Sequence, residues 1–368
     1  MKKKNTILGA VAFLAALTVS QAGNDIIFAN DFEPIGKNVF ISGHSLMDNP
    51  YAEDIALMAT AHNFAYNWNQ QIGIGSPIRV RTSGNASPPN NWQGYHQGKN
   101  RDTFDMDVVA ELANPSTIGN NNKYDALLIT ERHDLFDTIL WEYTNSLLRH
   151  YHDRLLTANP QAETLFYHSW LPIVASEPQV WIDEENLMQN VWECVSEKVN
   201  LTLLSDGLAA NVRVVPAGTA LTDLLTRILN DEVPGFSGTD LQKIDQLFDD
   251  DVHLNRAGIF YMAAVSYATL FKSSPVGTPI PADIDTATGN ALLQIAWDNV
   301  SPYLSNYTPK TMSQCRSIIE NQICDSYYNF TDRPEQIANC KIWISNNSTW
   351  QTNPFNWPDA NLITWGAP

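Results

Sequence analysis

The sequence is poor in cysteine, in basic residues and in long apolar runs. Only 4 of its 368 residues are cysteine, and none forms a Cys-x-x-Cys pair, which argues against a zinc or redox motif. Lys and Arg number 22 against 40 Asp and Glu, and a net charge of −18 repels nucleic-acid phosphates. Beyond the N-terminus, no apolar stretch approaches the about 20 residues of a transmembrane helix. We therefore expect no nucleic-acid partner, no integral membrane segment after processing, and no metal or cofactor.

The first 22 residues have the pattern of an export signal. Three lysines follow Met1, an apolar stretch covers residues 7–19, and Ser20-Gln21-Ala22 places small residues at the −3 and −1 positions of a cleavage site. We expect residues 1–22 to be a signal peptide and the mature acidic protein to be secreted or periplasmic in a bacterium. A retained N-terminal anchor is the alternative.

The four cysteines are expected to form two disulfides. An even count in an oxidising compartment favours complete pairing, and three connectivities are possible. We favour Cys315–Cys324 as a local link, with Cys194–Cys340 joining the tail to the main body.

Short β-branched runs alternate with longer helical patterns in residues 37–275. Strands are expected at residues 38–41, 77–81, 125–129, 163–167 and 212–215. Helices are expected at residues 51–68, 135–156, 184–204, 220–229 and 256–271. This alternation predicts one α/β domain with a central parallel sheet covered by helices on both faces, and 44% apolar residues suffice for its core. Residues 23–36 are expected to be an extended leader, and residues 276–368 a helical and irregular extension packed on the core.

Two short segments carry candidate chemistry. Ser45 follows the first expected strand, at the edge where parallel α/β sheets bind ligands. The Gly-x-Ser-x-Gly elbow is absent, which argues against an α/β-hydrolase. From this segment alone, Ser45 would be a helix N-cap. Asp250 precedes His253 by three residues, so one loop can supply a base and the carboxylate that orients it. Taken alone, the three aspartates at 249–251 would be a solvated helix cap and His253 a surface residue. Together the segments predict Ser45 as nucleophile, His253 as general base and Asp250 as the orienting acid.

In these two segments the sequence resembles the SGNH, or GDSL-like, hydrolases. Gly43-His44-Ser45-Leu46 is similar to the first block of that family, with His44 where Asp is commoner, and residues 250–254 are similar to its last block. The resemblance covers about residues 37–273 and is poor in the middle. It implies a flavodoxin-like three-layer α/β/α fold and ester hydrolysis by a serine nucleophile without a metal.

The sequence departs from the family pattern in the oxyanion hole. The family uses the N–H of the nucleophile, a glycine N–H and an asparagine side chain. Ser45 supplies the first donor, and either Gly73 or Gly75 supplies the second, with Gly73 preferred. No asparagine follows the third expected strand, where His133 or Arg132 could donate instead. Losing one donor can cost about 100- to 1000-fold in turnover, so this position bears directly on activity.

Three further residues are candidate substrate contacts. His44 precedes the expected nucleophile, while His168 and Trp170 follow the fourth expected strand and could line the same crevice. A packed histidine and tryptophan are the alternative for the last two.

These observations predict an exported serine esterase that hydrolyses short-chain acyl esters or acetyl esters of carbohydrates through an acyl-enzyme. The missing asparagine motivates an alternative, a catalytically silent protein of the same fold that binds a carbohydrate or another ligand. A lipase for long acyl chains is disfavoured because no long apolar lid is visible in the sequence.

Overall fold

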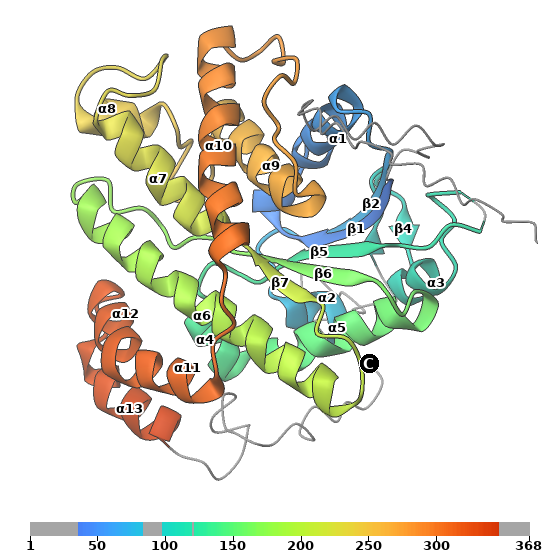
Figure 1. Cartoon of the computed structure of the whole chain (residues 1–368). Coiled ribbons are helices and arrows are strands. Elements are labelled where there is room, and N and C mark those ends of the chain that lie inside the picture. Colours follow the sequence, from blue (N-terminus) through green and yellow to red (C-terminus); the bar gives the residue numbers. More distant parts are fainter. Residues whose placement is uncertain (1–35, 84–97, 120, 346–368) are drawn as a thin grey trace, which may run out of the picture. The chain divides into compact units, whose positions relative to one another are not determined.

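The chain is described by a computed structural model that covers residues 36–83, 98–119 and 121–345. The expected signal peptide and almost all of the leader lie outside these residues. A five-stranded, all-parallel sheet is covered by helices on both faces (Figure 1). Its strand order is β2-β1-β5-β6-β7, in which the chain starts near the centre and winds outward both ways. The predicted flavodoxin-like α/β/α fold class is therefore confirmed.

The strands of the sheet are short and mostly apolar. They are β1 (Lys37–Gly43), β2 (Tyr66–Ile72), β5 (Ala126–Thr130), β6 (Glu163–Tyr167) and β7 (Val212–Val215). Val39 and Ile41 of β1 point into one core and Phe40 into the other, because successive side chains of a strand alternate between faces. A small hairpin, β3 (Gly98–Lys99) and β4 (Asp105–Met106), lies beside the sheet.

Two layers of helices cover the sheet (Figure 1). One layer contains α1 (Tyr51–Ala61), α7 (Ala217–Leu229), α8 (Asp240–Asp245), α9 (Arg256–Phe271) and α10 (Thr286–Asn306). The other contains α2 (Ile78–Ser83), α3 (Val108–Ala113), α4 (Leu135–Trp141), α5 (Thr144–Ala158) and α6 (Pro178–Ser205). Among the residues that the structure describes, no helix is long and apolar enough to cross a membrane.

Three of the predicted elements differ from the structure. The strand expected at residues 77–81 is wrong, because residues 78–81 lie in helix α2. The second strand is instead β2, whose first residues had been assigned to the helix at 51–68. The sequence of β2, YNWNQQI, lacks an apolar run because it is an edge strand with polar residues. The helix expected at 135–156 is divided into α4 and α5 at Tyr143, which has a left-handed φ of 56°.

The expected C-terminal extension is described up to residue 345, and these residues form two different parts. Helix α10 packs on α9 and α7, and its buried Leu292, Ala296 and Val300 belong to the core above the sheet. The chain then crosses to the other face and forms a helical unit beside α6 (Figure 1). This unit consists of α11 (Met312–Ile318), η3 (Ile319–Ile323), α12 (Cys324–Phe330), η4 (Pro334–Gln336) and α13 (Ile337–Ser345).

Two disulfides hold this helical unit, and their pairing differs from the predicted one. Cys194 in α6 is bonded to Cys315 in α11, and Cys324 to Cys340. The predicted Cys315–Cys324 link is wrong because both residues lie in one helical run, nine residues apart. At 1.5 Å per residue they are about 13 Å apart, beyond the about 7 Å that a disulfide spans between Cα atoms.

Candidate active site

The structure brings Ser45, His253 and Asp250 together from the two ends of the α/β domain. Nε2 of His253 lies 2.8 Å from Oγ of Ser45, and Nδ1 lies 2.7 Å from Oδ2 of Asp250. The imidazole of His253 thus bridges the hydroxyl of Ser45 and the carboxylate of Asp250. Ser45 and His253 are 208 residues apart in the sequence. This arrangement allows proton removal from the hydroxyl while the carboxylate fixes the tautomer of the ring.

Ser45 stands at the carboxyl end of β1, where the chain leaves the sheet. It opens the short 3-10 turn η1 (Ser45–Met47), with His44 as its N-cap. Gly43 is required before this turn, since a Cβ there would lie 2.8 Å from Sδ of Met47. Within the described part of the chain, the backbone N–H of Ser45 has no acceptor, so it remains available to a ligand.

Asp250 and His253 lie in a tight turn that precedes α9. Oδ1 of Asp250 accepts the backbone N–H groups of Val252 at 2.8 Å and His253 at 2.6 Å, while Oδ2 accepts the ring. Partial burial opposes ionisation of Asp250, but these hydrogen bonds outweigh it and lower its pKa to about 2. The carboxylate is therefore charged at any physiological pH. The side chains of His253 and Asp250 are 45% and 52% exposed, so the site is open to solvent.

His44 contributes to the scaffold of the site, and its predicted contact with substrate is not supported. Its side chain is buried, with Nε2 3.0 Å from the carbonyl oxygen of Glu131 and Nδ1 accepting the N–H of Leu46. Burial, reinforced by the charge of Arg81, lowers the pKa of His44 to about 3, so the ring is neutral. A neutral imidazole here ties the nucleophile turn to the end of β5.

The predicted oxyanion donors differ in their availability. The N–H of Gly73 donates to the carbonyl oxygen of Gly43 at 2.9 Å and so is already engaged, whereas Gly75 lies exposed at the tip of the same turn, with φ of 65°. Arg132 is engaged as well, since Nε and Nη2 bind both carboxylate oxygens of Asp134.

His133 is the donor that the segment after β5 leaves available. It is half-buried, and within the described residues neither ring nitrogen has a hydrogen-bond partner. Burial lowers its pKa below the ordinary value. His133 and His253 both contribute to the lowered pKa of His44, as expected for three imidazoles around one turn.

His168 and Trp170 are buried, and the structure does not support their predicted contact with substrate. The His168 ring lies between Oε1 of Gln189 at 2.8 Å and Oε2 of Glu185 at 3.1 Å. It also packs so closely on α7 that a Cβ at Gly218 would lie 2.4 Å from the ring. The Trp170 indole is 1% exposed. Both residues follow β6 and therefore lie at the predicted edge of the sheet, but both side chains are buried in the core.

No family model and no curated protein matches this chain. Among solved structures, it is similar to a DUF4886 family protein from Bacteroides uniformis, at 15% identity and a TM-score of 0.47. The match covers 74% of this chain and 98% of that one.

Two charged residues beneath the site were not predicted from the sequence. Glu131 is fully buried, and its carboxylate accepts the N–H groups of Ile78 and Arg132 and the hydroxyl of Thr144. Burial raises its pKa to about 7. Arg81, also buried, binds Oγ of Ser42 at 2.9 Å and the carbonyl oxygen of Thr130, which joins the ends of β1 and β5. The signal for Glu131 in the sequence was an acidic residue directly after a buried strand.

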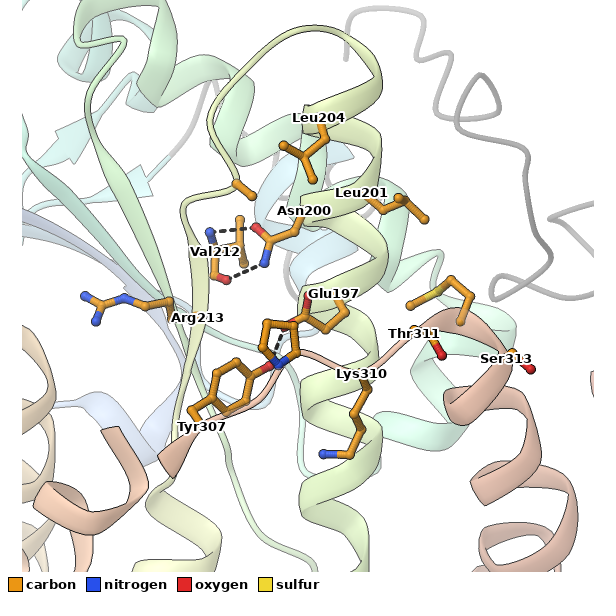
Figure 2. A pocket seen from close by; sticks show the side chains of 13 residues that line it. Glu197, Asn200, Leu201, Leu204, Val212, Arg213, Tyr307, Lys310, Thr311 and Ser313 are labelled. Carbon is orange, nitrogen blue, oxygen red and sulfur yellow. Dashed lines mark hydrogen bonds between the residues drawn. The ribbon is translucent and has the colours of Figure 1, made fainter. Parts of the chain in front are cut away.

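An apolar cavity of about 640 Å³ lies elsewhere in the fold (Figure 2). It is lined by the end of α6, the start of β7 and the segment that leads to α11. Asn200 on its wall pairs through its amide with both backbone groups of Val212, at 2.9 and 2.8 Å (Figure 2). Because this is the amino end of β7, the cavity is at the edge of the parallel sheet opposite to Ser45. In the part of the chain that the structure covers, no three His, Cys, Asp or Glu side chains are grouped as metal ligands.

Proposed function

We propose that this chain is an exported serine ester hydrolase with Ser45 as nucleophile, His253 as base and Asp250 as the orienting acid. The observation that carries the proposal is the continuous hydrogen-bonded series from Oγ of Ser45 through both nitrogens of His253 to Asp250. The two disulfides are consistent with export to an oxidising compartment.

In the proposed reaction, Oγ of Ser45 attacks the ester carbonyl carbon while Nε2 of His253 takes the hydroxyl proton. Negative charge develops on the carbonyl oxygen, and the free N–H of Ser45 donates to it, with the ring of His133 proposed as a second donor. The tetrahedral intermediate collapses, and His253 returns the proton to the departing alkoxide. Water then attacks the acyl-enzyme with His253 again as base, which releases the carboxylic acid and restores Ser45.

The openness of the site favours a small acyl group on an accessible alcohol. About half of the His253 and Asp250 side chains are in contact with solvent, so a large alcohol portion can extend outward from the reacting carbon. Acetyl esters of a carbohydrate and simple short-chain esters both satisfy this requirement. The chain has a net charge of −18, which disfavours strongly anionic substrates.

The proposal is tested by covalent labelling of Ser45 and by measurement of ester hydrolysis. A fluorophosphonate should form an adduct that mass spectrometry locates on Ser45, and Ser45→Ala should abolish hydrolysis of p-nitrophenyl acetate and acetate release from acetylated polysaccharide. Ser169→Ala is the matched control, because its hydroxyl lies at the same sheet edge and donates to the backbone carbonyl oxygen of Glu131 rather than to His253. An unlabelled Ser45 in a folded protein would instead favour the catalytically silent ligand-binding protein, and a Ser45→Ala variant above about a thousandth of wild-type turnover would exclude Ser45 as nucleophile.

A further inference from the structure

Two hydrogen bonds from the segment after β6 hold the turn that carries the proposed acid and base. The indole Nε1–H of Trp170 donates to the carbonyl oxygen of Val252 at 2.9 Å. The backbone N–H of Ile173 donates to the carbonyl oxygen of Asp251 at 2.7 Å. Both acceptors immediately precede His253, so these two bonds fix the backbone from which its imidazole extends.

Other polar contacts of this turn do not position it relative to the sheet. Asp250 binds the N–H groups of Val252 and His253, and the N–H of Asp249 donates to the carbonyl oxygen of His253. These bonds keep the internal shape of the turn. Within the described residues, the polar bonds from positions 249–253 to the rest of the protein are those to Trp170, Ile173 and Ser45.

The donor side of this contact is rigid. Trp170 is 1% exposed, and its ring packs against Tyr167 at 6.3 Å between centroids. The connection between β6 and α6 is fixed in turn by α6, where the carboxylate of Glu185 accepts the N–H of Leu171. A buried indole held on two sides can therefore impose its position on an exposed turn.

We propose that Trp170 is a positioning residue that keeps His253 within hydrogen-bond distance of Ser45. The inference rests on the proposed function. The buried indole does not touch substrate, so its loss should lower kcat and leave KM nearly unchanged. A misplacement of a reacting group by about 1 Å can cost 100-fold in rate, and we expect a decrease of about 10- to 100-fold when the indole N–H is removed.

The experiment compares Trp170→Phe with the matched control Trp181→Phe. Each variant loses one buried indole N–H that donates to a backbone carbonyl, but only the first loses a bond to the His253 turn. We expect similar decreases in melting temperature. For p-nitrophenyl acetate, kcat should fall about 10- to 100-fold in Trp170→Phe and stay within about threefold in Trp181→Phe, with the fluorophosphonate labelling rate of Ser45 following kcat.

A second replacement separates the N–H from the volume of the ring. β-(3-Benzothienyl)alanine at position 170 keeps the two fused rings and replaces N–H by sulfur, so it should lower kcat as Trp170→Phe does. Retention of kcat in this variant, or equal losses in Trp170→Phe and Trp181→Phe, would overturn the positioning role. Ser45→Ala is measured in parallel: if it stays active, the proposed function fails, whereas if it is inactive and Trp170→Phe keeps wild-type kcat, only the positioning role fails.

Discussion

Replacing Asp250 by Asn tests whether one carboxylate of the acidic turn has a specific role. Oδ1 of Asp250 accepts two backbone N–H groups, and an Asn side chain can keep both bonds only with its oxygen in that place. Its NH2 group then faces Nδ1 of His253, 2.7 Å from the replaced oxygen. A donor in this position favours the tautomer that carries its proton on Nε2. That nitrogen can no longer accept the proton of Ser45.

The size of the loss follows from the exposure of the pair. In serine proteases the corresponding change costs about 10⁴-fold in kcat, at a buried aspartate. Asp250 is 52% exposed, so water can partly replace the carboxylate and the ring can reorient. We therefore expect kcat/KM to fall by about 100-fold, which corresponds to about 2.7 kcal/mol in activation free energy.

The assay is ester hydrolysis by Asp250→Asn, with Asp249→Asn and Asp251→Asn as controls. All three changes remove one negative charge from the same turn, but within the described residues the carboxylates of Asp249 and Asp251 have no hydrogen-bond partner. The kcat/KM of both control variants should stay within about threefold of the wild-type value. Equal losses in all three variants would refute the reasoning, because they would show an effect of the net charge of the turn.

Two further predictions concern stability. The pKa of Glu131, raised to about 7 in the folded protein from 4.5, means that the folded state holds this proton more tightly, so stability should fall as pH rises from about 4.5 to 7. Glu131→Gln should remove this fall and gain about 3 kcal/mol at pH 8, as measured by urea unfolding at several pH values; an unchanged pH dependence would contradict the burial argument. The disulfides Cys194–Cys315 and Cys324–Cys340 close 121- and 16-residue separations, so replacing the first pair by serine should cost about 4–5 kcal/mol and the second about 3 kcal/mol. Four titratable thiols in protein purified without reductant would exclude both bonds.

The elements that the sequence predicts well are those in which burial alone decides the pattern. The strand at 163–167 and the helix at 256–271 have the expected bounds, since both are buried and carry long apolar sets. The edge strand β2 was missed because its polar residues satisfy no apolar pattern, and pairing with β1 is what makes it a strand. Pairing between distant segments cannot be read from local sequence.

The residues of the candidate site also differ in how well the sequence predicts them. The juxtaposition of Ser45, Asp250 and His253 was predictable from their residue types, their order and their positions before helices. The orientation of side chains after β6 was not identifiable, since His168 and Trp170 reach the correct edge but turn inward to Glu185 and Val252. Their partners come from α6 and from the turn before α9, which no periodicity connects.

The position of α10 has a consequence for where this protein can be shortened. A boundary drawn by family resemblance, at residue 275, would remove Leu292, Leu293, Ala296 and Val300, all of which are fully buried against the helices above the sheet. Burial of each large aliphatic side chain is worth about 1.5–3 kcal/mol, so the loss would be comparable with the entire stability of an ordinary domain, about 5–15 kcal/mol. The α/β unit therefore extends at least to the end of α10 at Asn306, and a chain cut at 275 should be recovered as an insoluble product.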